Sequence, residues 1–125
     1  MAGSSATLHE SPERLGPETI DRHRAIVSIM EELEAIDWYD QRAKASDDDA
    51  LREVLEHNRD DEKEHAAMAL EWLRRRDAHL DEQLRKYLFT EGSITERALE
   101  AVAGEQSDGD GGSLGIGSLR VEVTP

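Results

Sequence analysis

Two long segments with helical periodicity, separated by a short polar break, limit what this chain can build. The first is expected from about Glu18 to Lys44 and the second from about Asp48 to Arg76, each with apolar residues at three- and four-residue spacing. The break, Ser46-Asp47-Asp48-Asp49, offers helix-capping side chains. Because the connection is so short, we expect the two helices to be antiparallel neighbours.

A helical pair of this kind has a thin core. A short helix is expected over about Ala78 to Phe89, and a weak one over Ile94 to Ala103. We therefore expect one helical domain over residues 17–95 of this chain of 125 residues. Because so small a domain buries little of its surface, we predict an all-α fold in which two copies pair into a four-helix bundle.

The flanking segments differ in composition from the helical part. Residues 1–16 are small and polar, and we expect them to be disordered up to Pro17, which suits a first helical turn. Residues 96–112 are expected to be a flexible linker. In 113–125, Leu114, Ile116 and Leu119 are isolated large apolar residues in a glycine-rich stretch. This composition is typical of a peptide that orders as it docks into a partner's groove; an incidental tail is the alternative.

The net charge of the chain limits the classes of partner that it is expected to bind. Asp and Glu number 29 against 15 Lys and Arg, a net charge of -14. Such a field attracts cations and repels nucleic acid and anionic membranes, so we expect neither as a partner. No apolar run approaches the roughly 20 residues of a membrane span. The start of the chain does not resemble a secretory signal either, so we expect a cytoplasmic location.

A carboxylate and an imidazole interrupt the apolar row of the second helix. Its inward line reads Leu51, Leu55, Asn58, Glu62, His65, Ala69 and Trp72. Residues three apart share a helix face, so Glu62 and His65 can bind the same ion. A buried carboxylate without a partner is costly, and a metal ion would offset that cost. A surface ladder of ion pairs involving Arg59 and Lys63 is the alternative.

The first helix offers a matching carboxylate. Glu32 borders its apolar stripe, three residues after Ile29 and four before Ile36. Di-iron helical bundles use one Glu from each of two helices and Glu-x-x-His from each of two more. This chain has one Glu-x-x-His, so it can supply half of the set, and two copies could complete it. Without cysteine, its ligands are carboxylate and imidazole, which suit iron or manganese.

Other polar residues on the first helix lie near Glu32. Tyr39, seven residues after it, could assist the ligands or merely pack as an aromatic side chain. Glu31, Glu34 and Trp38 follow a neighbouring line. From two copies these carboxylates could draw ions inward, or they could form only a solvated face.

A second cluster is expected on the outer surface of the second helix. His57, Asp61 and Glu64 share a face at spacings of four and three. They could hold a looser, exposed metal such as calcium or manganese. Ordinary surface charge is the alternative.

The sequence resembles the encapsulated ferritins over about residues 18–95. The matching segments are Arg22–Ser28, Met30–Tyr39, His57–Asp60, Glu62–Met68, Glu71–Arg75 and Tyr87–Thr90. In addition, Ser113–Arg120 resembles the targeting peptide that loads cargo into encapsulin shells.

The resemblance implies a ferroxidase, which oxidises Fe(II) to Fe(III) for storage inside an encapsulin nanocompartment. It implies two-helix, ferritin-like subunits that form homodimers, with a di-iron centre at each dimer interface and five dimers in a ring-shaped decamer. By this resemblance, Glu32, Glu62, His65 and Tyr39 belong to the centre, and Glu31, Glu34 and Trp38 to an iron-uptake site. His57 and Glu64 belong to a peripheral site, where Asp61 stands in place of the family's Glu.

Three other functions remain open at this stage. One is iron binding without turnover, and another is a non-catalytic helical adaptor. The third is a rubrerythrin-like peroxidase, although this chain lacks the cysteines that would relay electrons.

Overall fold

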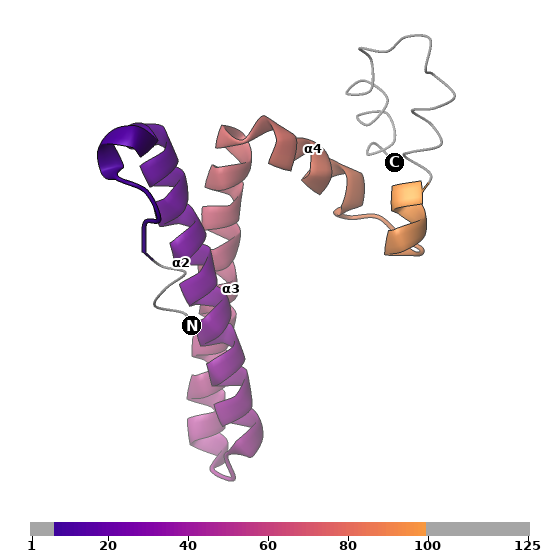
Figure 1. The fold of residues 1–125 in the computed structure, drawn as a ribbon. Coiled ribbons are helices and arrows are strands. Elements are labelled where there is room, and N and C mark those ends of the chain that lie inside the picture. Colours follow the sequence, from indigo (N-terminus) through magenta and orange to yellow (C-terminus); the bar gives the residue numbers. More distant parts are fainter. Residues whose placement is uncertain (1–6, 100–125) are drawn as a thin grey trace. The chain divides into compact units, whose positions relative to one another are not determined.

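The computed structural model describes residues 7–99, and every regular element in this range is helical (Figure 1). The helices are α2 (Pro12–Ala45), α3 (Asp49–Arg76) and α4 (Ala78–Tyr87). Residues 94–99 are helical as well. The predicted all-α fold is therefore confirmed. Residues 96–99, which were predicted as the start of the flexible linker, are helical. The rest of the linker, the peptide with Leu114, Ile116 and Leu119, and the end of the weak helix lie outside the described residues.

Helices α2 and α3 lie side by side as an antiparallel hairpin, as the short polar break predicts (Figure 1). Asp48 caps α3, because its Oδ1 accepts a hydrogen bond from the backbone N–H of Leu51 at 2.9 Å. Arg52 donates to the carbonyl of Ser46 at 2.8 Å and so ties α3 to the connection. These local bonds hold the closed end of the hairpin.

Helix α2 begins five residues earlier than its predicted first turn at Pro17. Ser11 is extended and precedes Pro12, and its carbonyl accepts from the N–H groups of Arg14 and Leu15 at 3.0 and 3.2 Å. The prediction of disorder over residues 1–16 is therefore wrong for residues 12–15. The reason is a second start signal, since proline at the first helical position and Glu13 in the first turn both favour a helix.

Gly16 marks a kink between this first turn and the rest of α2. Its backbone has φ 79° and ψ 163°, a region open essentially to glycine alone, and the following Pro17 disfavours helical geometry at this position. A side chain would strain the backbone here, although no neighbouring atom lies within 4 Å of the place a Cβ would take.

We expect Gly16→Ala to destabilise the hairpin by about 1–3 kcal/mol, the usual cost of forcing a side chain into this region. Urea unfolding followed by circular dichroism measures the change. Ser28→Ala is the matched control, because the Ser28 hydroxyl donates to the Arg24 carbonyl of its own helix and its loss should matter little. Equal unfolding midpoints for the two variants would contradict the strain argument.

The hairpin has almost no finished core. Among the described residues, the buried apolar residues are Ala43 and Leu73. Large apolar side chains that should be covered are instead about half exposed or more, and they include Ile26, Leu33, Leu51, Val54 and Met68. A single copy therefore leaves apolar surface in water, as the thin-core argument predicts.

The chain divides between Arg76 and Asp77 into two units, so the predicted domain 17–95 spans both of them. In the second unit, Asp77 caps α4 by accepting from the Leu80 N–H at 2.9 Å. Helix α4 ends at Tyr87, two residues before the predicted end, and Phe89 takes a positive φ of 61°. Within residues 7–99, none of the helices combines the length and the apolar character needed to cross a bilayer.

Candidate metal centre

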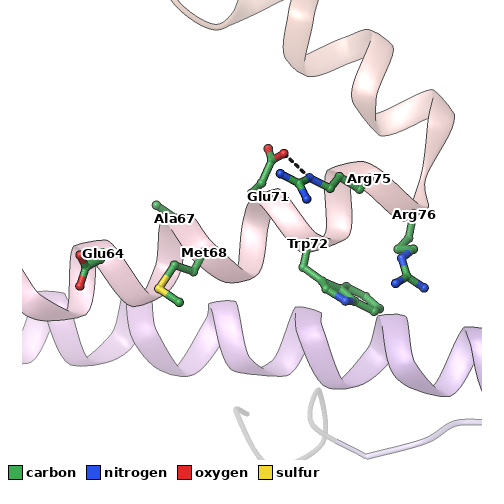
Figure 2. A pocket seen from close by; sticks show the side chains of 7 residues that line it. All are labelled: Glu64, Ala67, Met68, Glu71, Trp72, Arg75 and Arg76. Carbon is green, nitrogen blue, oxygen red and sulfur yellow. Dashed lines mark hydrogen bonds and ion pairs between the residues drawn. The ribbon is translucent and has the colours of Figure 1, made fainter.

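An open hollow of about 540 Å³ runs along α3 and includes one of the predicted peripheral residues (Figure 2). It is lined by Glu64, Ala67, Met68, Glu71, Trp72, Arg75 and Arg76. Arg74 donates twice to the Glu71 carboxylate at 2.7 Å, and Arg75 donates once at the same distance. These two guanidiniums lower the pKa of Glu71 to about 2. The negative charge of Glu71 is thus already balanced by two arginines, and within residues 7–99 the lining of this hollow contains no group of three side chains close enough to share an ion.

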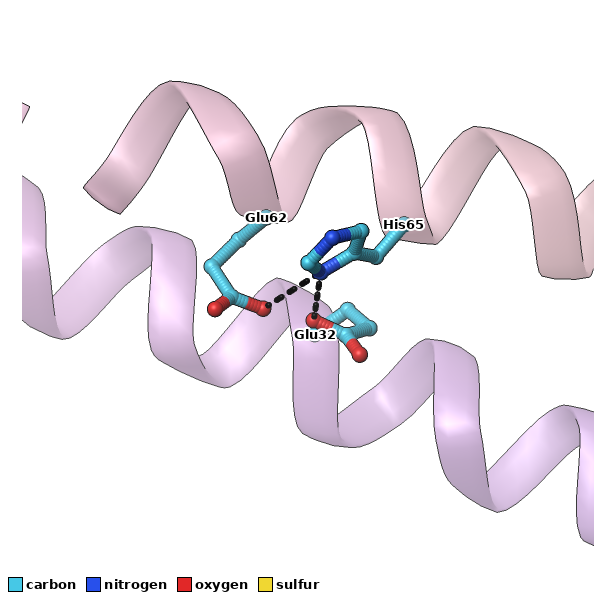
Figure 3. Close-up of side chains that lie close together, drawn as sticks. All are labelled: Glu32, Glu62 and His65. Atoms are coloured by element: carbon cyan, nitrogen blue, oxygen red, sulfur yellow. Dashed lines mark ion pairs between the residues drawn. The ribbon is translucent and has the colours of Figure 1, made fainter. Parts of the chain in front are cut away.

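A second group of side chains, two carboxylates and one imidazole, lies between the two helices of the hairpin (Figure 3). His65 Nδ1 lies 3.5 Å from Glu62 Oε2 on the same helix and 3.8 Å from Glu32 Oε2 on α2. One ligand atom from each of the three residues lies within 4.8 Å of the others. The structure thus brings the Glu-x-x-His pair of α3 together with Glu32, the carboxylate that the apolar pattern of α2 predicts as its partner.

The three side chains of this group differ in how far they are exposed to solvent. The side chains of Glu62 and Glu32 are 24% and 26% exposed, whereas His65 is 50% exposed. The α-helical spacing sets Glu62 and His65 on one face, and the antiparallel pairing brings Glu32 from the neighbouring helix. The half-exposed imidazole places one side of the group on the outer surface of a single copy.

The donor set fits a divalent transition metal. Two carboxylates and one imidazole are hard and intermediate ligands, which suit Fe(II) or Mn(II). Within residues 7–99, neither Glu32 nor Glu62 forms an ion pair with an arginine or lysine, in contrast to Glu71. Three ligand atoms cover only part of the coordination sphere of such an ion, so the remaining ligands would come from water or from a second copy.

The aromatic residues predicted near this group have a partner that sequence reasoning missed. The Arg42 guanidinium lies 5.6 Å from the ring centre of Tyr39 and 6.0 Å from that of Trp38. Both rings are thus held by one cation on α2. Spacings of three and four residues could have suggested these contacts. Glu31 and Glu34 are exposed on α2 and do not belong to the three-residue group.

The predicted peripheral cluster is only partly assembled in one copy. His57 Nε2 lies 3.2 Å from Asp61 Oδ2, and both side chains are mostly exposed. Glu64 is exposed as well and lines the hollow of Figure 2. Within the described part of the chain, these three residues do not form a group of ligand atoms close enough to share an ion.

Comparison with known proteins gives concordant matches. Residues 7–91 match the sequence model of the family described as EncFtn-like. An encapsulated ferritin-like protein of Rhodospirillum rubrum is 60% identical over 132 residues, covering 98% of this chain and 94% of that protein. A ferritin-like protein of Thermotoga maritima is 50% identical over 111 residues, covering 89% and 96%.

Two further matches cover less of the chain. The encapsulin nanocompartment cargo protein EncC of Myxococcus xanthus is 35% identical over 83 residues, covering 63% of this chain and 64% of that protein. The crystal structure of a protein from Nitrosomonas europaea is 54% identical, with a TM-score of 0.67 over 70% of this chain and 96% of that one.

Proposed function

Because the chain belongs to the EncFtn-like family of encapsulated ferritin-like proteins, we propose that it is a ferroxidase whose di-iron centre forms between two copies. The observation that carries the proposal is the Glu32, Glu62 and His65 group, in which ligand atoms lie within 4.8 Å of one another. Its donor chemistry suits Fe(II), which is here the substrate.

A second copy would complete both the ligand set and the core. One chain contributes two Glu and one His, so two chains supply the four Glu and two His of a di-iron bundle. Val54 and Met68 lie close to His65 around the circumference of α3, at about 20° and 60°, and are 55% and 65% exposed. A two-fold axis beside His65 would cover these apolar side chains and bring the two half sites together.

The paired carboxylates explain how two iron ions could be held close together. Bridging carboxylates offset the charge of both ions and hold them roughly 3.5–4 Å apart. Each Fe(II) gives up one electron, so a pair supplies the two electrons that, with two protons, convert dioxygen to hydrogen peroxide. The resulting Fe(III) hydrolyses and leaves the site. On this proposal, exposed Glu31 and Glu34 draw Fe(II) inward beside Trp38, and Tyr39 lies next to the centre.

The names of two relatives support a proposal for where the oxidised iron is stored. The Rhodospirillum rubrum relative is named as encapsulated, and the Myxococcus xanthus relative as an encapsulin nanocompartment cargo protein. We therefore place this chain inside a cytoplasmic encapsulin shell, which would store the oxidised iron. On the same family grounds, we propose a ring-shaped decamer built from five dimers.

Native mass spectrometry of the full chain, before and after anaerobic addition of Fe(II), tests the shared centre directly. We expect even-numbered assemblies, with each dimer gaining two iron ions together. Iron binding by monomers, or masses that ignore iron, would contradict a centre built between copies. Uptake of two ions without any later consumption of oxygen would instead favour iron binding without turnover.

A further inference from the structure

The three-residue group depends on how α2 is aligned along α3. Glu62 and His65 belong to one helix, so their spacing is set by helix geometry, but Glu32 comes from the other helix. A slide of one residue moves Glu32 by about 1.5 Å along the pair, which is large beside a 3.8 Å separation from His65. The apolar packing offers limited resistance to such a slide, since Ala43 and Leu73 are the only buried apolar residues within residues 7–99.

Arg59, one turn before Glu62 on α3, bridges the two helices. Its Nη1 donates to Asp40 Oδ1 on α2 at 2.9 Å, and its Nε donates to Asp60 Oδ1 at 3.0 Å. The guanidinium side chain is only 22% exposed, although Asp40 is 64% exposed. The hydrogen bonds that Arg59 donates to Asp60 and Asp40 raise the pKa of Arg59, which therefore stays charged in this bridge.

The bridge lies on the other flank of the hairpin from the imidazole. Arg59 is three residues before Glu62 and His65 is three after it, so the two are about 120° apart around α3. Arg59 therefore neither competes with the ion nor depends on the copy that would cover His65. Its planar fork joins two carboxylates at fixed distances, a task for which a single flexible ammonium is poorly suited.

We infer that the Arg59–Asp40 hydrogen bond sets the alignment of α2 on α3 that brings Glu32 to Glu62 and His65. Arg59 and Asp40 are thus positioning residues for the metal centre. The inference rests on the proposed function, because the centre is the site being positioned.

Binding of Co(II) to the full chain tests this role without redox chemistry, since the visible absorption of Co(II) reports its coordination geometry. We expect Arg59→Gln and Asp40→Asn each to weaken Co(II) binding roughly three- to tenfold and to alter the Co(II) spectrum. The double variant should bind Co(II) no more weakly than the weaker of the two single variants, because all three lack the same charged pair of guanidinium and carboxylate. Since Asp40 is largely exposed and Asn has the same shape, Asp40→Asn remains informative if Arg59→Gln folds poorly.

Lys63→Ala is the matched control. Lys63 also donates to Asp60, at 3.0 Å, but that bond lies within α3. Its loss removes one positive charge, as Arg59→Gln does, and should leave Co(II) affinity within about twofold of the unaltered chain. Equal losses in Lys63→Ala and Arg59→Gln, or additive losses in the double variant, would overturn the positioning role.

His65→Ala separates a failure of this inference from a failure of the proposed function. If His65→Ala abolishes Co(II) binding but the Arg59 and Asp40 variants bind normally, the positioning role is wrong and the centre stands. If the unaltered chain does not bind Co(II), or His65→Ala binds it equally well, the proposed centre itself is wrong.

Discussion

Replacing His65 with alanine is expected to slow Fe(II) oxidation by at least about a hundredfold, because each centre then loses two of its six proposed ligands. The remaining carboxylates could still attract iron, but they would no longer define a closely spaced pair of ions. Stopped-flow mixing of anaerobic, iron-loaded protein with oxygenated buffer measures the rate of Fe(III) formation.

His79→Ala is the matched control for this experiment. His79 also has a carboxylate three residues away on its helix, with Nδ1 lying 3.9 Å from Glu82 Oε2, and it is 81% exposed. Among the residues that the structure describes, no ion pair links His79 to a carboxylate of another helix. The same substitution there should leave oxidation unchanged. Equal rates for the His65 and His79 variants would exclude His65 as a ligand.

The substitution Glu32→Gln tests whether the carboxylate on α2 binds metal. The substitution keeps the size of the side chain but removes the negative charge that would balance the ions, so we expect a loss comparable to that of Glu32→Ala. If Glu32→Gln oxidised iron normally while Glu32→Ala did not, Glu32 would be filling space rather than binding metal. Mass spectrometry of each variant shows whether the dimer persists.

Removing residues 113–125 is expected to abolish encapsulation while leaving iron oxidation unchanged. Leu114, Ile116 and Leu119 are the large apolar groups that would dock on the shell, whereas the proposed metal ligands all lie within α2 and α3. Co-expression with an encapsulin shell protein, followed by size-exclusion chromatography and gel analysis of the shell fraction, measures loading. Stopped-flow kinetics of the truncated chain measure oxidation.

The control for the truncation keeps the full length of the chain. Replacing Leu114, Ile116 and Leu119 with serine preserves the linker but removes the apolar side chains, so it should prevent loading as completely as the truncation. A truncated chain that still co-purifies with the shell would refute the docking role. A truncated chain that loses oxidation as well would show that the tail supports the fold or assembly of the helices.

The bounds of the helices were predictable where the signals are local. The α2–α3 break and the cap at Asp48 follow from a run of short polar residues, and α3 begins within one residue of its predicted start. The early start of α2 was missed because Gly16-Pro17 looked like the first boundary. In fact Ser11-Pro12-Glu13 starts a helical turn that Gly16 then bends.

The residues of the candidate site also divide into those that local sequence signals predict and those that they do not. The Glu62–His65 pair follows from one helix period, and Glu32 could be named because it borders the apolar stripe of α2. The peripheral cluster was less predictable. His57 and Asp61 meet through their side chains, but Glu64, although it shares the helical face, lines the neighbouring hollow instead. Helical spacing places Cβ atoms, while rotamers and neighbours decide where the ligand atoms lie.

The sequence by itself determined the all-α class, the antiparallel hairpin, its thin core and the identity of one Glu-x-x-His pair. These depend on periodicity and capping, which act over a few residues. Only the tertiary structure decided that Glu32 meets that pair and that Arg59 reaches Asp40, nineteen residues away. The physical reason is that contacts between two helices depend on their axial alignment, which neither helix pattern specifies alone.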